Sequence, residues 1–154
     1  MKLVVAGTGY VGLVAGVCFA EMGHDVTCVD VDDEKVRLME SGVCPIYEDG
    51  LEELMQKNFA AGRLHYTTDY ASAYRNPDAI FIGVGTPEQP DGSANLNYIA
   101  TVCRQIAENV ERDCLVVVKS TVPVGTNDRV EQFIQDFLLR KELHIEVASN
   151  PEFL

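Results

Sequence analysis

Short apolar runs alternate with stretches of helical periodicity along the whole chain. Six runs have the length and the Val, Ile and Leu content of buried strands. Between them, apolar residues recur at three- and four-residue spacing. Strands that are apolar throughout and alternate with helices indicate a parallel sheet covered on both faces. The pattern therefore predicts an α/β fold, a doubly wound and mainly parallel six-stranded sheet, with strands at residues 2–6, 25–31, 64–67, 79–84, 115–119 and 144–148.

Local signals mark the ends of the expected helices. Gly23 is placed to end a first helix, Asp33 can cap a second and Asp69 can cap a short turn. Asn95 can cap the helix that contains Ile99. The helices are expected at residues 11–22, 33–40, 51–60 and 69–74, around the apolar series 99, 102, 106 and 110, and around the series 130, 133, 134, 137 and 138.

Length and charge exclude several classes of protein. The 154 residues fit one domain, and 12 Lys and Arg against 24 Asp and Glu give a formal net charge of −12. Nucleic-acid surfaces and polybasic membrane-binding surfaces need clustered cations, so neither partner is expected. No apolar run approaches the length of a membrane span, and the first residues lack the pattern of a signal peptide. We expect a cytoplasmic protein.

The five cysteines give no sign of a metal site or a disulfide framework. None forms a CxxC pair, and none lies at zinc-ligand spacing from a histidine. Their neighbours are mostly apolar, so we expect free thiols in the core and no bound metal. The cysteines are Cys18, Cys28, Cys44, Cys103 and Cys114.

The strongest chemical signal is the motif GTGYVG at residues 7–12, directly after the first expected strand. Gly7 permits a tight turn, Gly9 lets the backbone approach a pyrophosphate, and Gly12 lets helix and strand pack closely. Free amides at the start of the following helix then face the phosphates. The motif in this position is typical of a Rossmann-type dinucleotide-binding domain. The alternative is a glycine turn that only packs a helix on a strand.

Asp30 supplies the acidic residue that such a domain requires. It lies at the end of the second strand, 18 residues after Gly12, where a carboxylate can accept both hydroxyls of the adenosine ribose. Asp32, Asp33 and Glu34 follow and would repel a 2′-phosphate. These residues predict NAD rather than NADP as the cofactor. The alternative for Asp30 is a solvated carboxylate at a strand end.

Three further loops follow the fourth, fifth and sixth strands, at the edge where open α/β sheets bind ligands. They offer backbone amides, hydroxyls and one carboxylate near the nicotinamide. Gly, Pro, Ser and Asn also form turns for local reasons, so each loop alone is compatible with a plain turn. Their common position on one edge favours a ligand site. The loops contain Gly85 and Thr86, Ser120 and Thr121, and Ser149 to Glu152.

Together these motifs make the chain similar to the NAD-binding N-terminal domain of the UDP-glucose/GDP-mannose dehydrogenase family. The resemblance covers the whole chain in order, and KSTVPVGT at 119–126 followed by SNPEFL at 149–154 is its most specific part. Lys119 and the VPVG that follows it at 122–125 favour the members that act on UDP-glucose. Members that act on GDP-mannose more often carry an Arg and Leu-Pro-Gly there. VDVD at 29–32, PIYEDGL at 45–51 and VGTP at 84–87 also match.

The resemblance implies an enzyme that oxidises the C6 alcohol of a nucleotide-sugar to a carboxylate and reduces two NAD. It places Thr121 and Glu152 near the reacting carbon, where Thr121 orders a water and Glu152 takes part in proton transfer. The alternatives are an exposed helix residue for Lys35 and a solvated carboxylate for Glu152. The implied cofactor residues are Gly7, Gly9, Tyr10, Val11, Gly12, Asp30, Lys35, Gly85, Thr86, Ser120 and Thr121, and the implied substrate residues are Ser149, Asn150, Pro151 and Glu152.

The resemblance also implies that residues 1–154 are the N-terminal fragment of a longer enzyme. The family's catalytic cysteine and most of its sugar-nucleotide pocket belong to a central helix and a C-terminal domain, and no cysteine here matches the nucleophile's motif. We expect the chain to bind NAD without turning over UDP-glucose, and the whole protein to be a homodimer formed largely through that helix. Two alternatives stay open: the same domain of a GDP-mannose or UDP-N-acetylmannosamine dehydrogenase, and a free-standing NAD-sensing module.

Overall fold

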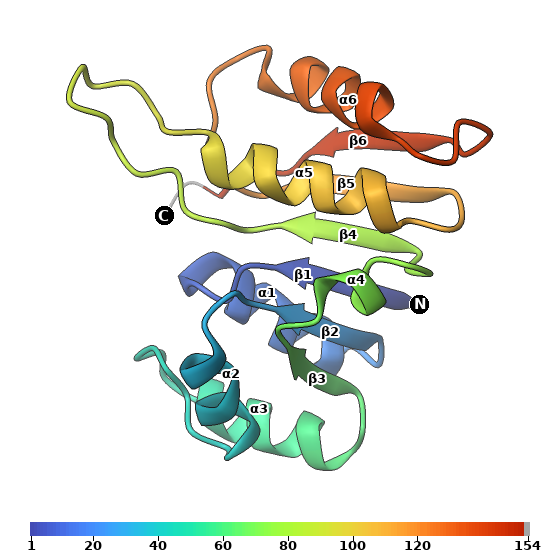
Figure 1. Cartoon of the computed structure of the whole chain (residues 1–154). Coiled ribbons are helices and arrows are strands. Elements are labelled where there is room, and N and C mark those ends of the chain that lie inside the picture. The colour runs from blue at the N-terminus through green and yellow to red at the C-terminus, as the bar shows by residue number, and fades with distance from the viewer. Residues whose placement is uncertain (153–154) are drawn as a thin grey trace.

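Six parallel strands form one sheet in the order β3-β2-β1-β4-β5-β6 in a computed structural model that describes residues 1–152 (Figure 1). The chain starts in the middle of the sheet, winds outward to β3 and crosses back to β4. The prediction of a doubly wound sheet is confirmed, and every pairing between neighbouring strands is parallel. The strands are β1 (Lys2–Ala6), β2 (Asp25–Val29), β3 (Leu64–Thr67), β4 (Ala79–Ile82), β5 (Cys114–Val118) and β6 (Ile145–Ser149).

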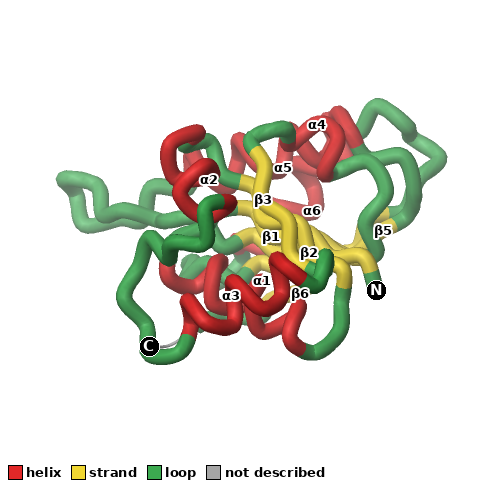
Figure 2. The backbone as a smooth tube through the Cα atoms, turned by 90° about the horizontal axis from the view of Figure 1, so that it is seen from below, coloured by secondary structure: helices red, strands yellow, loops and turns green. Residues whose placement is uncertain are grey.

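Helices cover both faces of the sheet, as Figure 2 shows. α1 and α3 lie on one face, and α5 and α6 lie on the other. α2 adds Val36 and Met39 to the core on the α1 side. The helices are α1 (Tyr10–Glu21), α2 (Asp33–Glu40), α3 (Leu51–Ala60), α4 (Tyr70–Ala73), α5 (Asn97–Asn109) and α6 (Thr126–Phe137).

The four inner strands are largely apolar because each one contributes to two hydrophobic clusters, whereas the edge strands β3 and β6 each contribute to one. In β1, Leu3 and Val5 pack into the cluster beneath α1 and α3, whereas Val4 and Ala6 pack into the cluster beneath α5 and α6. Successive side chains of a strand point to opposite faces, so both sets are buried. The sheet thus separates two cores.

The strand register brings the carboxyl ends of five strands to one level. Ala6 lies opposite Val29 on one side and Ile82 on the other. Ile82 is paired with Val118, which in turn is paired with Ser149. The loops after these strands therefore emerge along a single edge of the sheet. The segment between β4 and α5 projects furthest from this edge (Figure 1).

Three strands are shorter at their carboxyl ends than the sequence predicts. They end at Val29, Ile82 and Val118, one or two residues earlier than predicted, and the sixth begins at Ile145. Val31 and Val84 are β-branched and apolar, but they lie beyond the strand ends, in the edge loops. Val31 illustrates this, since its side chain is 88% exposed.

Most of the expected caps are present, with one correction. The amide of Gly23 donates to Ala20 O at 3.0 Å, and Asp69 accepts from the amide of Ser72 at 3.1 Å. The assignment of Asp33 as a cap is wrong: Asp32 is the cap and accepts from the Lys35 amide at 3.1 Å. Both aspartates suit the position chemically, so only the backbone path distinguishes them.

Asn95 lies one residue before the N-cap position of α5, which Leu96 occupies. Its Oδ1 accepts from the amide of Asn97, the first helical residue, at 3.0 Å. The side chain therefore still satisfies one of the free amides at the start of the helix.

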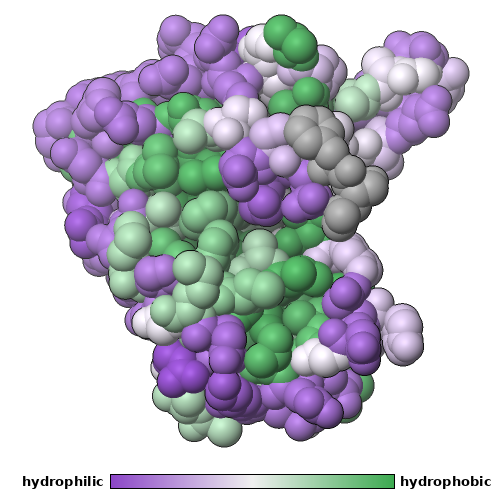
Figure 3. All heavy atoms as spheres, turned by 180° about the vertical axis from the view of Figure 1, so that it is seen from behind, coloured by the Kyte–Doolittle hydropathy of each residue, from purple (hydrophilic) through white to green (hydrophobic). Residues whose placement is uncertain are grey.

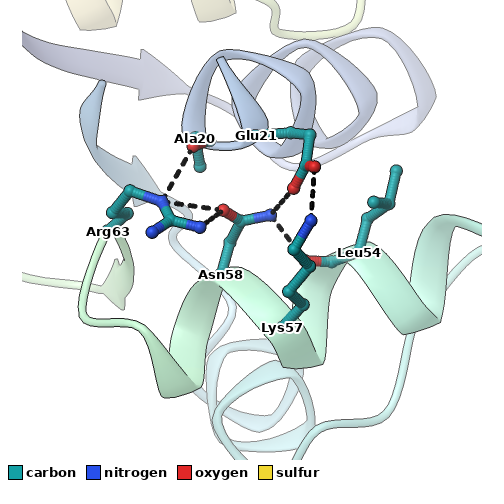
Figure 4. A network of polar contacts seen from close by, with 6 residues as sticks. All are labelled: Ala20, Glu21, Leu54, Lys57, Asn58 and Arg63. Atoms are coloured by element: carbon teal, nitrogen blue, oxygen red, sulfur yellow. Dashed lines mark hydrogen bonds and ion pairs between the residues drawn. The ribbon is translucent and has the colours of Figure 1, made fainter. Parts of the chain in front are cut away.

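A polar network fixes α3 against the end of α1 (Figure 4). The fully buried Asn58 donates to Glu21 Oε2 at 2.8 Å and accepts from Arg63 Nη2 at 2.8 Å. Arg63 Nε also donates to Ala20 O at 3.2 Å, and Lys57 pairs with Glu21 at 2.5 Å. Each polar atom of the Asn58 side chain has a partner, which is what burial of an amide requires.

The expectation that every cysteine lies in the core is wrong for Cys18, which is exposed, and Cys44 is half-buried. Because α1 is apolar on all sides, its sequence does not show which side faces the sheet. Leu13 and Val17 face the core and leave Cys18 outside. Burial raises the pKa of Cys28 and Cys103 to about 12, so these thiols are unreactive.

No helix within residues 1–152 is long and apolar enough to cross a membrane.

Candidate functional site

A cavity of about 310 Å³ opens at the carboxyl ends of β1, β2 and β4. β1 and β4 are neighbours in the sheet but not in the chain, so the winding direction reverses between them. Open α/β sheets bind ligands in the crevice at such a reversal. The volume also falls in the range of small-molecule pockets, roughly 300–1,000 Å³.

The glycine loop borders this cavity and needs its glycines for different reasons. Gly7 has φ +93°, a backbone conformation that favours glycine. A Cβ on Gly12 would lie 1.9 Å from the carbonyl oxygen of Gly7. Gly9 has no atom within 4 Å of its Cβ position and lines the cavity. Gly7 thus makes the expected tight turn and Gly12 allows the expected close packing. Gly9 leaves open space in which a ligand can approach the backbone.

The first turn of α1 has free backbone amides and begins at Gly9, which lines the cavity, whereas Tyr10 and Val11 line a smaller hollow on the other side of the turn. Gly9 is the N-cap, and no side chain within the described part of the molecule caps this turn. Its leading amides, including those of Tyr10 and Val11, therefore have no intrahelical partner, and the helix dipole favours an anion here. The Tyr10 hydroxyl points away and donates to Glu48 Oε2. In these two residues the backbone, not the side chain, suits a pyrophosphate.

Asp30 follows β2 and accepts four hydrogen bonds. Its Oδ2 receives the amide of Thr8 at 3.0 Å, the Thr8 hydroxyl and Lys35 Nζ at 3.2 Å, and its Oδ1 receives the Asp32 amide at 3.1 Å. Partial burial by itself would raise the pKa of Asp30, but the hydrogen bonds and the lysine outweigh it and lower the pKa. The carboxylate is therefore ionised at neutral pH and can accept a ribose hydroxyl.

Lys35 lies on α2, and its ammonium group forms a salt bridge with the Asp30 carboxylate. The Lys35 side chain is 25% exposed. The alternative of an exposed helix residue near Asp32 does not describe this position. These features fit a dinucleotide: the uncapped helix start suits the pyrophosphate, and the ionised carboxylate at the strand end suits the adenosine ribose.

Several cavity residues were not predicted from the sequence. Thr8 lies inside the glycine motif, and Tyr98, Thr101 and Gln105 line the cavity from α5. The last three recur at spacings of three and four residues, beside the apolar stripe that marks the core face of the helix. That second stripe is polar, so in the sequence it is indistinguishable from a solvated helix face.

The loops after β4 and β5 are tied to each other. Gly85 lines the cavity, and the Thr86 hydroxyl donates to Thr121 O at 3.2 Å. Ser120 is buried, and its hydroxyl donates to Val84 O at 2.7 Å. The Ser120 hydroxyl thus stabilises the backbone of the loop after β4.

The loops after β5 and β6 also meet. Lys119 Nζ donates to Asn150 Oδ1 at 2.9 Å, and the Thr121 hydroxyl donates to the backbone oxygen of Glu152 at 3.0 Å. Lys119, Asn150 and Glu152 line a second hollow of about 260 Å³, together with Tyr10 and other residues of α1. Thr121 and Glu152 are therefore brought together as expected, but through a main-chain atom of Glu152.

The other residues of the last motif lie around this second hollow without lining it. Ser149 is the exposed last residue of β6, and Pro151 is half-buried. Phe153 and Leu154 lie outside the described residues. Over residues 1–152, no group of three or more His, Cys, Asp or Glu side chains is arranged to hold a metal ion.

Comparison with known proteins also indicates a dinucleotide-binding domain over the full length of the chain. A family model described as the UDP-glucose/GDP-mannose dehydrogenase family, NAD binding domain, matches residues 1–154. A UDP-glucose 6-dehydrogenase of Bacillus subtilis is 53% identical over 154 residues, which are 100% of this chain and 35% of that protein. The UDP-glucose 6-dehydrogenase of Rhizobium meliloti is 48% identical, with the same coverage. The chain thus spans about a third of the length of these relatives.

Solved structures with the same fold include enzymes named for two different substrates. A ternary complex of GDP-mannose dehydrogenase from Pseudomonas aeruginosa is 43% identical, with a TM-score of 0.92 over 100% of this chain and 36% of that one. A UDP-glucose dehydrogenase from Pyrobaculum islandicum is 42% identical, with a TM-score of 0.93 over 99% of this chain and 36% of that one.

Proposed function

The chain belongs to the UDP-glucose/GDP-mannose dehydrogenase family as its NAD-binding domain, and we propose that the whole protein is a UDP-glucose 6-dehydrogenase. The reaction is the oxidation of the C6 alcohol of UDP-glucose to the carboxylate of UDP-glucuronate, with reduction of two NAD. The observation that carries this proposal is the 53% and 48% identity to UDP-glucose 6-dehydrogenases over the entire chain.

We propose that residues around the larger cavity bind the cofactor. The amides of Tyr10 and Val11 face the pyrophosphate beside Gly9, and Asp30 with Lys35 binds the adenosine ribose. Gly85, Thr86 and Ser120 shape the continuation of the site toward β5. When bound, NAD accepts a hydride from the substrate carbon. The free helix amides and the ionised Asp30 support this assignment.

We propose that the smaller hollow belongs to the substrate. Glu152 lines it, and the Thr121 hydroxyl donates to the backbone oxygen of Glu152. There Thr121 holds a water and Glu152 moves a proton during hydrolysis of the oxidised intermediate, a role that a carboxylate can fill. Ser149, Asn150 and Pro151 position this segment, with Lys119 holding Asn150.

A second candidate is the same reaction on GDP-mannose. The 43% identity and TM-score of 0.92 to a GDP-mannose dehydrogenase favour it. Against it stands the β5 loop, where Lys119 and the VPVG of residues 122–125 replace the Arg and Leu-Pro-Gly more common in those enzymes.

Residues 1–154 form the cofactor domain of this proposal, and further domains complete the substrate site. The outer face of α1 supports the division, because Cys18 and Met22 are exposed there beside the half-buried Val11 and Val14. Figure 3 shows hydrophobic residues gathered on the face of the molecule that α1 covers. An apolar helix face of this kind is typical of a contact with further protein. The family resemblance also supports a cytoplasmic homodimer as the form of the whole protein.

The test is an assay of the whole protein with NAD and, in parallel, UDP-glucose, GDP-mannose and UDP-N-acetylmannosamine. We expect turnover of UDP-glucose with two NADH formed per UDP-glucuronate. Turnover of GDP-mannose alone would transfer the proposal to the second candidate. NAD binding without turnover of any of the three would favour the sensing module.

A further inference from the structure

Thr8 is a polar residue with no exposed surface, in the middle of the glycine loop. Both of its donors, the amide and the hydroxyl, point at the same atom, Asp30 Oδ2. Its neighbours Gly7 and Gly9 have no side chains, so Thr8 supplies the side-chain contact between the loop and this carboxylate. A buried hydroxyl that donates to a charged acceptor makes one of the stronger kinds of hydrogen bond.

The two oxygens of Asp30 are left with different capacities. A carboxylate oxygen offers about two lone pairs. Oδ2 already receives two donors from Thr8 and one from Lys35, so it is saturated. Oδ1 receives the Asp32 amide alone among the described residues, which leaves room for one further donor. Oδ1 is therefore the atom available to a ribose hydroxyl.

Thr8 is also the more rigid of the groups that hold Oδ2. The loop that carries it is fixed to β2, since the Gly7 amide donates to Val29 O at 2.8 Å. Lys35 instead reaches Asp30 on a flexible stem that is 25% exposed, so it can move when a ligand enters. The orientation of the carboxylate thus depends mainly on Thr8.

We propose that Thr8 is a positioning residue that holds the Asp30 carboxylate with Oδ1 toward the ribose and thereby sets the preference for NAD over NADP. The proposal rests on the proposed role of Asp30 as the ribose acceptor. A carboxylate fixed in this way repels a 2′-phosphate, because both groups are negatively charged and the carboxylate cannot rotate away. Without the Thr8 hydroxyl, Asp30 keeps its charge but gains rotational freedom.

The test is calorimetric titration of the 154-residue chain with NAD and with NADP. Thr8→Val removes the hydroxyl at nearly constant shape. We expect it to weaken NAD binding by about tenfold, the effect of one ordinary hydrogen bond, and to lower the ratio of NAD to NADP affinity. Thr8→Ser restores the hydroxyl and should restore both values. Thr27→Val, the same substitution on β2 away from the cavity, serves as the matched control.

A titration of the Asp30 carboxyl by NMR adds a readout that a purely structural role would not move. We expect the pKa of Asp30 to rise in Thr8→Val and to return in Thr8→Ser. If Thr8→Val does not fold, Thr8→Ala provides the same comparison with a smaller side chain.

Asp30→Asn separates the inference from its premise. If Asp30→Asn weakens NAD binding while Thr8→Val, folded, binds NAD and NADP like the unmodified chain, the role of Thr8 is overturned and that of Asp30 stands. If Asp30→Asn binds NAD normally, the premise itself fails. Weakening in Thr8→Val that Thr8→Ser does not reverse also contradicts the inference.

Discussion

Single atoms decide what the glycine motif tolerates, and Gly12 and Gly9 differ most clearly. A Cβ on Gly12 would collide with the carbonyl oxygen of Gly7, which is backbone and cannot swing aside. A Cβ on Gly9 would meet no protein atom and would stand at the cavity instead. One glycine is thus required for packing, and the other is kept free for a ligand.

We therefore expect opposite results from the same substitution at these two sites. Gly12→Ala should lower the free energy of unfolding by about 3 kcal/mol, the upper part of the range for overpacking. Gly9→Ala should change it by less than about 0.5 kcal/mol, yet weaken NAD binding by about tenfold or more, equivalent to ~1.4 kcal/mol. Urea unfolding and calorimetry measure the two effects, and each variant is the control for the other. Equal loss of stability in both would contradict the assignment.

Asp30 should also contribute to the pH dependence of stability. Because its pKa is lower in the folded chain than in the unfolded one, its contribution is fully present above the unfolded value, about 3.9. The contribution is lost as the pH falls through the lower, folded value. Urea unfolding of the unmodified chain and of Asp30→Asn should show a difference that is larger at pH 7 than at pH 3. A difference that stays constant with pH would contradict this linkage.

The sequence predicted those site residues whose type is unusual for their place, and it missed those that look ordinary. Glycines at fixed spacing and an acid after an apolar strand have few other reasons to occur together, so Gly7 and Asp30 were found. Thr8 and Gln105 are common residues of loops and helix surfaces. Their place at the cavity depends on long-range packing between β1, β2 and α5, and no local signal reports it.

At the scale of elements, the alternation of strands and helices was predictable because burial on two faces requires apolar strands. The ends of two strands were not, because Val31 and Val84 in the edge loops are as apolar as the strand residues. The packing of α3 on α1 was not predicted either. It depends on the buried amide of Asn58, a residue type that sequence reasoning places on a surface.

Asn58 should accordingly matter for stability and not for the cofactor. Asn58→Ala removes the hydrogen bonds that link Arg63 and Glu21 through the buried amide, and we expect it to lower the free energy of unfolding by about 1–3 kcal/mol. NAD affinity should stay unchanged, since Asn58 does not line the cavity. Glu53→Ala, on the exposed side of the same helix, is the control and should leave stability nearly unchanged. An equal effect of both substitutions would show that the network is not the cause.

For the molecule as a whole, the apolar face of α1 and the net charge of −12 act against each other. The face favours association, while like charges keep copies apart until salt screens them. We expect the 154-residue chain to self-associate at high concentration, and more so in high salt. Sedimentation of Met22→Gln should show less association. Leu139→Gln, which replaces a similarly exposed apolar residue (67%) elsewhere, should not change it. A chain that stays monomeric at high salt would contradict this expectation.

The reversal of the winding direction between β1 and β4 has a consequence for how the molecule opens. The two halves of the sheet meet there, and the cavity is bordered by Gly9 and Asp30 after β1 and β2 and by Gly85 and Gln105 after β4. Each half can act as its own cooperative unit in hydrogen exchange. A cofactor that touches both halves stabilises only the state in which they are joined. Bound NAD should therefore slow amide exchange in β3 and β6 alike, although these strands lie at opposite edges of the sheet.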